Sequence, residues 1–138
     1  MSADLVFDVE ATTAGLRSCQ DGILASGTRS KLPRDMISRL QIVVEELFSN
    51  TIKYGYGGEC ERPVRLRLRC APPVELVYED AAPPFDPTAW RENPTPRGGV
   101  GRKGIVLVLG LAESVRYERT GEGNRLTLRF LTPSTGAP

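Results

Sequence analysis

Glu46 and Asn50 are the first pair of side chains whose types and spacing could do chemistry. In a helix, residues four positions apart lie on one face, and Lys53 would continue that face a turn later. A carboxamide oxygen suits a hard Mg²⁺ ion, and a carboxylate can orient or deprotonate an attacking hydroxyl. Most isolated pairs of this kind belong to a solvated helix face, so this pair needs support from elsewhere in the chain.

Asp80 is the second candidate, because it ends a segment in which polar and apolar residues alternate. The alternation places it on the same face as Leu76 and Tyr78, which we expect to face the helices. An inward carboxylate needs a donor, and the exocyclic amino group of adenine would be one. The alternative is an ordinary turn capped by the aspartate. A proline-rich stretch containing Phe85 follows.

The third candidate is a glycine-rich segment, residues 98–104, that runs into an apolar stretch. Glycine lets backbone amides approach phosphate oxygens, and a helix N-terminus favours anions. Arg102 and Lys103 add positive charge at the same place. Glycine-rich turns also occur without any ligand, and the segment matches neither the P-loop nor the dinucleotide-binding pattern.

Composition limits the chemistry further. The 138-residue chain has no histidine, which excludes nucleophile systems and metal sites that depend on imidazole. Its net charge of +1 argues against nucleic acid as the main partner. The three cysteines are far apart, and we expect thiols in a reducing compartment. Without a leader or a long apolar segment, we expect one cytoplasmic domain (residues 1–138) and no membrane contact.

Apolar patterns predict the elements that must position these residues. We expect strands at about 5–9, 64–70, 74–80, 115–119 and 124–130, and helices at about 13–26, 33–54 and 105–111. Gly22 should weaken the first helix by about 1 kcal/mol. Residues 81–101 lack periodicity, which is typical of a lid, a binding loop or disorder.

The strands expected at 64–70 and 74–80 each have one polar face, so the hairpin that they form should expose this face to solvent. We expect the arginines of one, Arg65, Arg67 and Arg69, to meet the glutamates of the other. The order of elements predicts an α+β fold. It is a two-layer sandwich whose mostly antiparallel sheet carries helices on a single face.

Taken in order, the three candidate segments resemble the Bergerat-fold (GHKL) ATPase superfamily, which includes gyrase and the histidine kinases. The segment from Val44 to Tyr56 is similar to a helix of the bacterial anti-sigma factors that are also serine-protein kinases. The sequence also resembles the pattern of this branch at residues 104–108, 112–117 and 123–126. The resemblance covers about residues 5–131 and implies the Bergerat ATP-binding fold.

The resemblance also implies a site for ATP and Mg²⁺. Asn50 would coordinate the metal ion, Glu46 would be the catalytic base and Asp80 would bind the adenine amino group. The residues that it implies for nucleotide binding are Asn50, Lys53, Asp80, Ala82, Phe85, Gly99, Gly101, Arg102, Lys103 and Gly104. The glycine-rich lid, with Arg102 and Lys103, would hold the phosphates.

The partners implied are proteins. The phosphoacceptor would be a serine on an anti-sigma-factor antagonist. Unphosphorylated antagonist would draw this protein off a sigma factor, and phosphorylation would return it. Members of the branch are typically homodimers, so we expect a homodimer.

Two positions depart from the family pattern. Ala82 replaces a glycine of the first family box, and Arg102 stands where a glycine is often found in the second. The methyl group of Ala82 would crowd the adenine, or restrict the turn if this residue needs a positive φ. The alternative function is therefore a module of the same fold that regulates a partner by binding alone. An enzyme unrelated to ATP is a third alternative.

Overall fold

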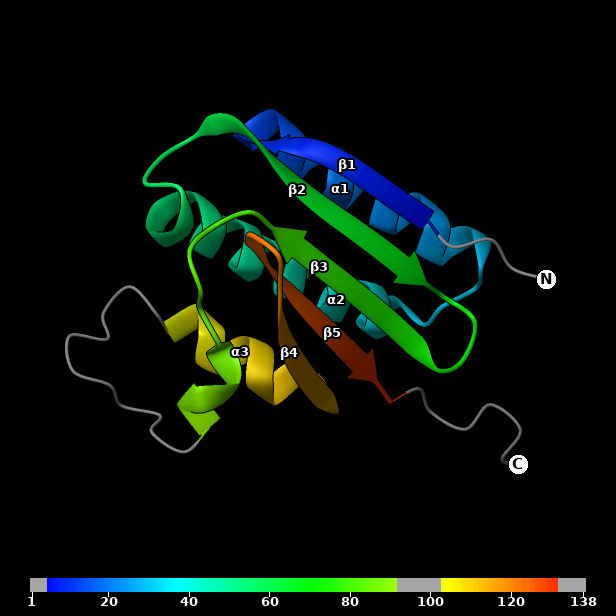
Figure 1. Ribbon diagram of the computed structural model, residues 1–138. Coiled ribbons are helices and arrows are strands. Elements are labelled where there is room, and N and C mark those ends of the chain that lie inside the picture. Colours follow the sequence, from blue (N-terminus) through cyan, green and yellow to red (C-terminus); the bar gives the residue numbers. More distant parts are fainter. Residues whose placement is uncertain (1–4, 92–102, 132–138) are drawn as a thin grey trace.

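One antiparallel sheet carries three helices on a single face (Figure 1). The computed structural model describes residues 5–91 and 103–131. The strands lie in the order β1-β2-β3-β5-β4, and their bounds are β1 (Leu5–Ala11), β2 (Cys60–Arg69), β3 (Val74–Asp80), β4 (Ser114–Thr120) and β5 (Gly123–Phe130). The helices are α1 (Thr13–Arg29), α2 (Arg34–Asn50) and α3 (Lys103–Leu111). The expected α+β sandwich is confirmed.

The sheet is amphipathic because successive side chains of a strand point to opposite faces. In β2, Val64, Leu66 and Leu68 are buried beneath the helices, whereas the arginines between them are exposed. β2 begins before Pro63, earlier than expected. Proline is tolerated there because the pairing with β3 starts only at Val64, so Pro63 has β1 alone as a neighbour.

α2 ends in a wider turn than the pattern predicts. Its buried residues recur at three- and four-residue steps from Met36 to Phe48. The expected helix over 33–54 is α-helical only to Asn50, and Thr51–Gly55 form a π-helical turn. There the amide nitrogen of Tyr56 donates to the carbonyl of Thr51 at 2.7 Å. This turn leaves the Thr51 side chain buried against the end of β3.

The outer face of the sheet carries a row of alternating charges across all five strands. Register places Asp8, Arg65, Glu79, Arg125 and Glu118 side by side. Arg65 pairs with Asp8 at 3.0 Å, and Arg125 pairs with Glu79 at 2.7 Å. The β3 glutamates thus pair with arginines of β5 rather than with those of β2, as Arg129 on Glu75 also illustrates. The expected exposure of this face is confirmed. Register also places Arg65 opposite Glu79 and Arg69 opposite Glu75, as expected, whereas the ion pairs of the two glutamates are with β5.

The pairing of β3 with β5 joins two segments that are distant in sequence. The turn η2 (Pro87–Arg91), α3 and β4 lie between these two strands along the chain. Asp80 at the end of β3 is the register partner of Asn124 at the start of β5.

Within the described ranges, none of the helices combines the length and apolar character needed to cross a bilayer.

Candidate functional site

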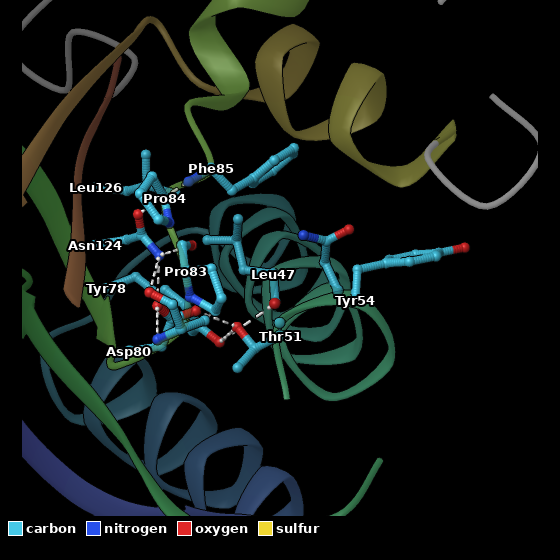
Figure 2. A pocket seen from close by; sticks show the side chains of 13 residues that line it. Leu47, Thr51, Tyr54, Tyr78, Asp80, Pro83, Pro84, Phe85, Asn124 and Leu126 are labelled. Carbon is cyan, nitrogen blue, oxygen red and sulfur yellow. Dashed lines mark hydrogen bonds between the residues drawn. The ribbon is translucent and has the colours of Figure 1, made fainter. Parts of the chain in front are cut away.

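A cavity opens where α2 ends, β3 ends and β5 begins (Figure 2). The space inside it is about 620 Å³ when the part open to solvent is included, and the cavity volume proper is about 120 Å³. Leu47, Phe85 and Leu126 form apolar parts of its wall, and Asn50 and Asp80 are among its polar residues. The cavity therefore combines an apolar lining with a few polar groups, as ligand sites generally do.

Asp80 is the carboxylate of the cavity, and both of its oxygens accept hydrogen bonds from the protein. Its Oδ2 accepts from Thr51 Oγ1 at 2.8 Å, and its Oδ1 accepts from Asn124 Nδ2 at 2.9 Å and from the amide of Ala82 at 3.2 Å. Asp80 faces the helices, as its strand pattern predicts. A carboxylate held by donors from the protein can only accept further hydrogen bonds. It therefore suits a ligand that presents an amino group.

Tyr78 and Thr51 form a buried chain of hydroxyl groups behind Asp80. The Tyr78 hydroxyl lies 2.6 Å from Thr51 Oγ1 and 3.2 Å from the carbonyl oxygen of Leu47, and it can donate its one hydrogen to either. Burial first, and the nearby Asp80 charge second, raise the pKa of Tyr78 well above its usual value. Tyr78 therefore stays protonated, and the Thr51 hydroxyl can direct its own hydrogen to Asp80.

A second hollow adjoins the cavity on the side of α3. It has an empty volume of about 280 Å³ and is lined by Glu46, Lys53 and Gly104, and it shares Asn50 and Tyr54 with the first cavity. Glu46 and Gly104 are in close contact, because a Cβ atom at Gly104 would collide with Glu46 Oε1. The N-terminal turn of α3 and the Glu46 carboxylate thus meet in this hollow.

The two hollows together contain most of the predicted site residues that the structure describes. Asn50, Asp80, Ala82 and Phe85 line the first, and Asn50 again lines the second with Glu46, Lys53 and Gly104. Lys103 is the first residue of α3. Gly99, Gly101 and Arg102 lie outside the described residues. Asn50 thus lines both hollows, whereas Asp80 lines only the first and Glu46 only the second.

Ala82 fits its turn without strain. Lys31 is the one residue other than glycine with a positive φ in the described ranges, so Ala82 does not need the conformation that glycine favours. Its side chain is only 3% exposed. A Cβ at Gly55 would lie 2.9 Å from the Ala82 Cβ, so the missing side chain at Gly55 makes room for the methyl group. The condition for a restricted turn, a positive φ at Ala82, is therefore not met, whereas crowding of an adenine stays a prediction.

Sequence reasoning missed two polar residues of the site, Thr51 and Asn124. Both are buried, at 3% and 7% exposure. Thr51 directly follows Asn50, and this adjacency could have identified Thr51 as a candidate site residue. Asn124 is 44 residues from Asp80 along the chain, and only the pairing of β3 with β5 brings them together.

The donor set fits a nucleotide with its Mg²⁺ better than a metal held by protein alone. No group of three or more acidic, cysteine or histidine side chains that could hold a metal ion occurs in residues 5–91 and 103–131. Mg²⁺ usually takes one or two protein oxygens and fills its other positions with water and phosphate. Asn50, with Glu46 one helical turn before it, offers such a partial set.

The fold and the site define a histidine kinase-like ATPase domain. The family model of that domain matches residues 9–130. The chain belongs to this family, and the expected membership of the GHKL superfamily is confirmed.

A solved structure narrows the comparison. The chain is similar to the crystal structure of the RsbU and RsbW domains of Rv1364c from Mycobacterium tuberculosis, with a TM-score of 0.68 and 13% identity. The match covers 95% of this chain and 33% of that one, so this chain spans about a third of its length. At this identity the similarity establishes the fold alone. No curated protein sequence matches the chain.

Proposed function

We propose that this protein binds ATP with Mg²⁺ and phosphorylates a serine on an anti-sigma-factor antagonist, and that it sequesters a sigma factor when the antagonist is phosphorylated. The observation that carries the proposal is the placement of Asp80 and Asn50 in one cavity and of Asn50 and Glu46 in the adjoining hollow. The two hollows offer an acceptor for an amino-bearing base and oxygen ligands for a metal–phosphate group.

Each residue has a distinct role in this proposal. Asp80 accepts a hydrogen bond from the adenine amino group, and Leu47 and Phe85 contact the base. The Asn50 carboxamide oxygen holds Mg²⁺, which when bound neutralises phosphate charge. Glu46 orients the serine hydroxyl and takes its proton. Lys53, the N-terminal turn of α3 with Gly104 and Lys103, and the segment with Gly99, Gly101 and Arg102 hold the phosphates.

Two observations support the partner-switching part of the proposal. The residues from Val44 to Tyr56 are similar to those of the anti-sigma kinases, and the chain shares its fold with a structure that contains an RsbW domain. We propose that the chain is a single cytoplasmic domain that acts as a homodimer. Its partners would be the sigma factor and the antagonist.

The test is titration calorimetry with ATP and Mg²⁺, followed by transfer of labelled phosphate to candidate antagonists. Asn50→Ala should abolish ATP binding, because it removes the proposed metal ligand. Glu46→Gln should keep ATP binding and reduce phosphoryl transfer by about 10²–10⁴-fold, the usual contribution of a general base.

Glu45→Gln is the matched control for Glu46→Gln. It makes the same change of charge at the preceding residue of α2, where the side chain is exposed and lines neither hollow. It should leave binding and transfer unchanged. Equal losses in the two variants, or full transfer in Glu46→Gln, would contradict the role of Glu46.

The buried methyl group of Ala82 favours a second candidate, regulation by partner binding without nucleotide. That methyl group lies in the wall where an adenine would stack, and it narrows the space left by the usual glycine. Absence of ATP binding at millimolar nucleotide would support this function over the kinase.

A further inference from the structure

Asn124 lines the cavity and makes hydrogen bonds to three separate elements around it. It begins the inward face of β5, is 7% exposed, and is the register partner of Asp80 on β3 and of Arg119 on β4. A buried carboxamide must find partners for two hydrogens and two lone pairs. Here those partners lie on β3, on β4 and on the turn that follows β3.

The amide nitrogen of Asn124 faces acceptors only. Nδ2 lies 2.9 Å from Asp80 Oδ1, 3.2 Å from the carbonyl of Ala82 and 3.0 Å from that of Pro83. Its two hydrogens are shared among these three oxygens. The same group therefore orients the Asp80 carboxylate and holds the backbone that carries the next part of the wall.

The amide oxygen of Asn124 faces donors only. Oδ1 accepts from the Tyr117 hydroxyl at 2.6 Å, from the amide of Phe85 at 3.1 Å and from Arg119 Nη1 at 3.5 Å. If the nitrogen and the oxygen of this amide were exchanged, the NH₂ group would face the donors on Phe85 and Arg119. The amide oxygen would then face the Asp80 carboxylate. The network therefore fixes the orientation of this amide, and Figure 2 shows Asn124 between Asp80 and the segment from Pro83 to Phe85.

We propose that Asn124 is a positioning residue that fixes Asp80 and the 82–85 wall before ligand binds, and thereby selects a purine whose exocyclic group is a hydrogen-bond donor. The selectivity rests on the proposed nucleotide function, whereas the fixing of the wall does not. With Thr51, Asn124 and the Ala82 amide already donating to it, Asp80 keeps only acceptor capacity for a ligand. A ligand carbonyl at this place would meet an oxygen that cannot donate.

The experiment compares ATP with inosine triphosphate, which has a carbonyl oxygen in place of the exocyclic amino group. The wild-type protein should bind ATP more tightly. In Asn124→Ala the ATP affinity should fall about ten-fold or more, because a hydrogen bond to a charged group loses its alignment. The affinity for inosine triphosphate should fall less, so the ratio of the two should shrink. Unfolding of a fraction of the protein lowers both affinities equally and leaves the ratio unchanged.

A second readout needs no nucleotide. The amide hydrogen of Phe85 should exchange about ten-fold faster in Asn124→Ala than in the wild type, because it loses its acceptor and its segment loses two anchors. The amide of Leu66 in the core of β2 should keep its rate and so reports that the variant is folded. Arg125→Gln, at the next residue but on the open face, should change neither the ratio nor the Phe85 exchange.

Two further variants guard against a failure to fold. Asn124→Asp keeps the shape of the side chain but replaces the donor with an oxygen, and should lower the ATP preference as Asn124→Ala does. Tyr117→Phe removes one donor to Oδ1 and should give a smaller change in the same direction.

Each result decides one part of the proposal. An unchanged nucleotide ratio in folded Asn124→Ala overturns the selectivity, and unchanged Phe85 exchange overturns the positioning role. A wild-type protein that binds neither nucleotide overturns the proposed function together with the selectivity, while the Phe85 exchange still decides the positioning role by itself.

Discussion

The contact between Glu46 and Gly104 links the position of the Glu46 carboxylate to the absence of a side chain at one position of α3. A Cβ at Gly104 would occupy the place of Glu46 Oε1, so any larger residue must displace the carboxylate. Gly110, six residues later on the same helix, has open space around its Cβ position. A side chain at Gly104 would thus collide with Glu46, whereas a side chain at Gly110 would have free space. Of these two glycines, only Gly104 lies in the proposed site.

We predict that Gly104→Ala reduces phosphoryl transfer by about 10²-fold, the usual effect of moving a catalytic group by about an ångström. Gly110→Ala should leave transfer unchanged and raise the free energy of unfolding by about 0.5–1 kcal/mol, because alanine favours a helix over glycine. Phosphate transfer and urea unfolding of the two variants check this pair. A Gly104→Ala protein with full transfer would show that Glu46 does not act from its observed position.

At the scale of elements, the packing of β1 on α1 explains why α1 has a glycine at position 22. The sequence predicts a helix that weakens at Gly22, yet α1 runs through this residue to Arg29. The aromatic ring of Phe7 occupies the place where a Cβ at Gly22 would stand. The glycine therefore serves close approach between sheet and helix, and its cost in helix propensity is offset by packing.

Gly22→Ala should accordingly destabilise the protein by about 1–3 kcal/mol, the usual cost of overpacking a core. Adding Phe7→Leu to Gly22→Ala should recover part of the loss, because the smaller side chain leaves room for the methyl group. Urea unfolding of the single and double variants measures both effects. If Gly22→Ala were stabilising, helix propensity would outweigh the contact with Phe7.

The predictable part of the structure is the part that local patterns determine. Alternation along β2 and β3 is enough to place Asp80 inward, and helical spacing is enough to put Glu46 and Asn50 on one face. The partner of Glu79 was not predictable, because Arg125 is supplied by a strand that joins β3 only after a crossover. Asn124 escaped prediction for the same reason, since its contacts exist only once β3 and β5 are paired.

At the scale of the whole molecule, the absence of histidine determines how stability depends on pH. No side chain with an ordinary pKa between 5 and 8 is present. Burial raises the pKa of the Cys19 thiol from its usual 9.0 to about 11, and it raises the pKa of Tyr78 as well. Both groups are therefore neutral in the folded core under conditions in which they ionise in the unfolded chain.

We predict that the free energy of unfolding is nearly flat from pH 6 to pH 8 and falls above pH 9. Between pH 9 and pH 11 the unfolded chain has lost the Cys19 proton and the folded chain has kept it, so the slope with pH is negative. Cys19→Ala should lower the free energy of unfolding at pH 7, because it leaves a cavity. Between pH 9 and pH 10 the free energy of unfolding of this variant should fall less steeply than that of the wild type. Urea unfolding across this range measures the slopes, and equal slopes would rule out Cys19 as the source.

The crossover between β3 and β5 has a consequence for the energetics of any occupant. The first cavity takes Leu47 and Asp80 from the part of the chain before the crossover, and Asn124 and Leu126 from the part after it. A molecule bound there touches both parts and opposes the detachment of the C-terminal hairpin. Because binding to the folded state alone adds RT ln(1 + [L]/Kd) to stability, occupancy would be detectable as a higher melting temperature even where no phosphate is transferred.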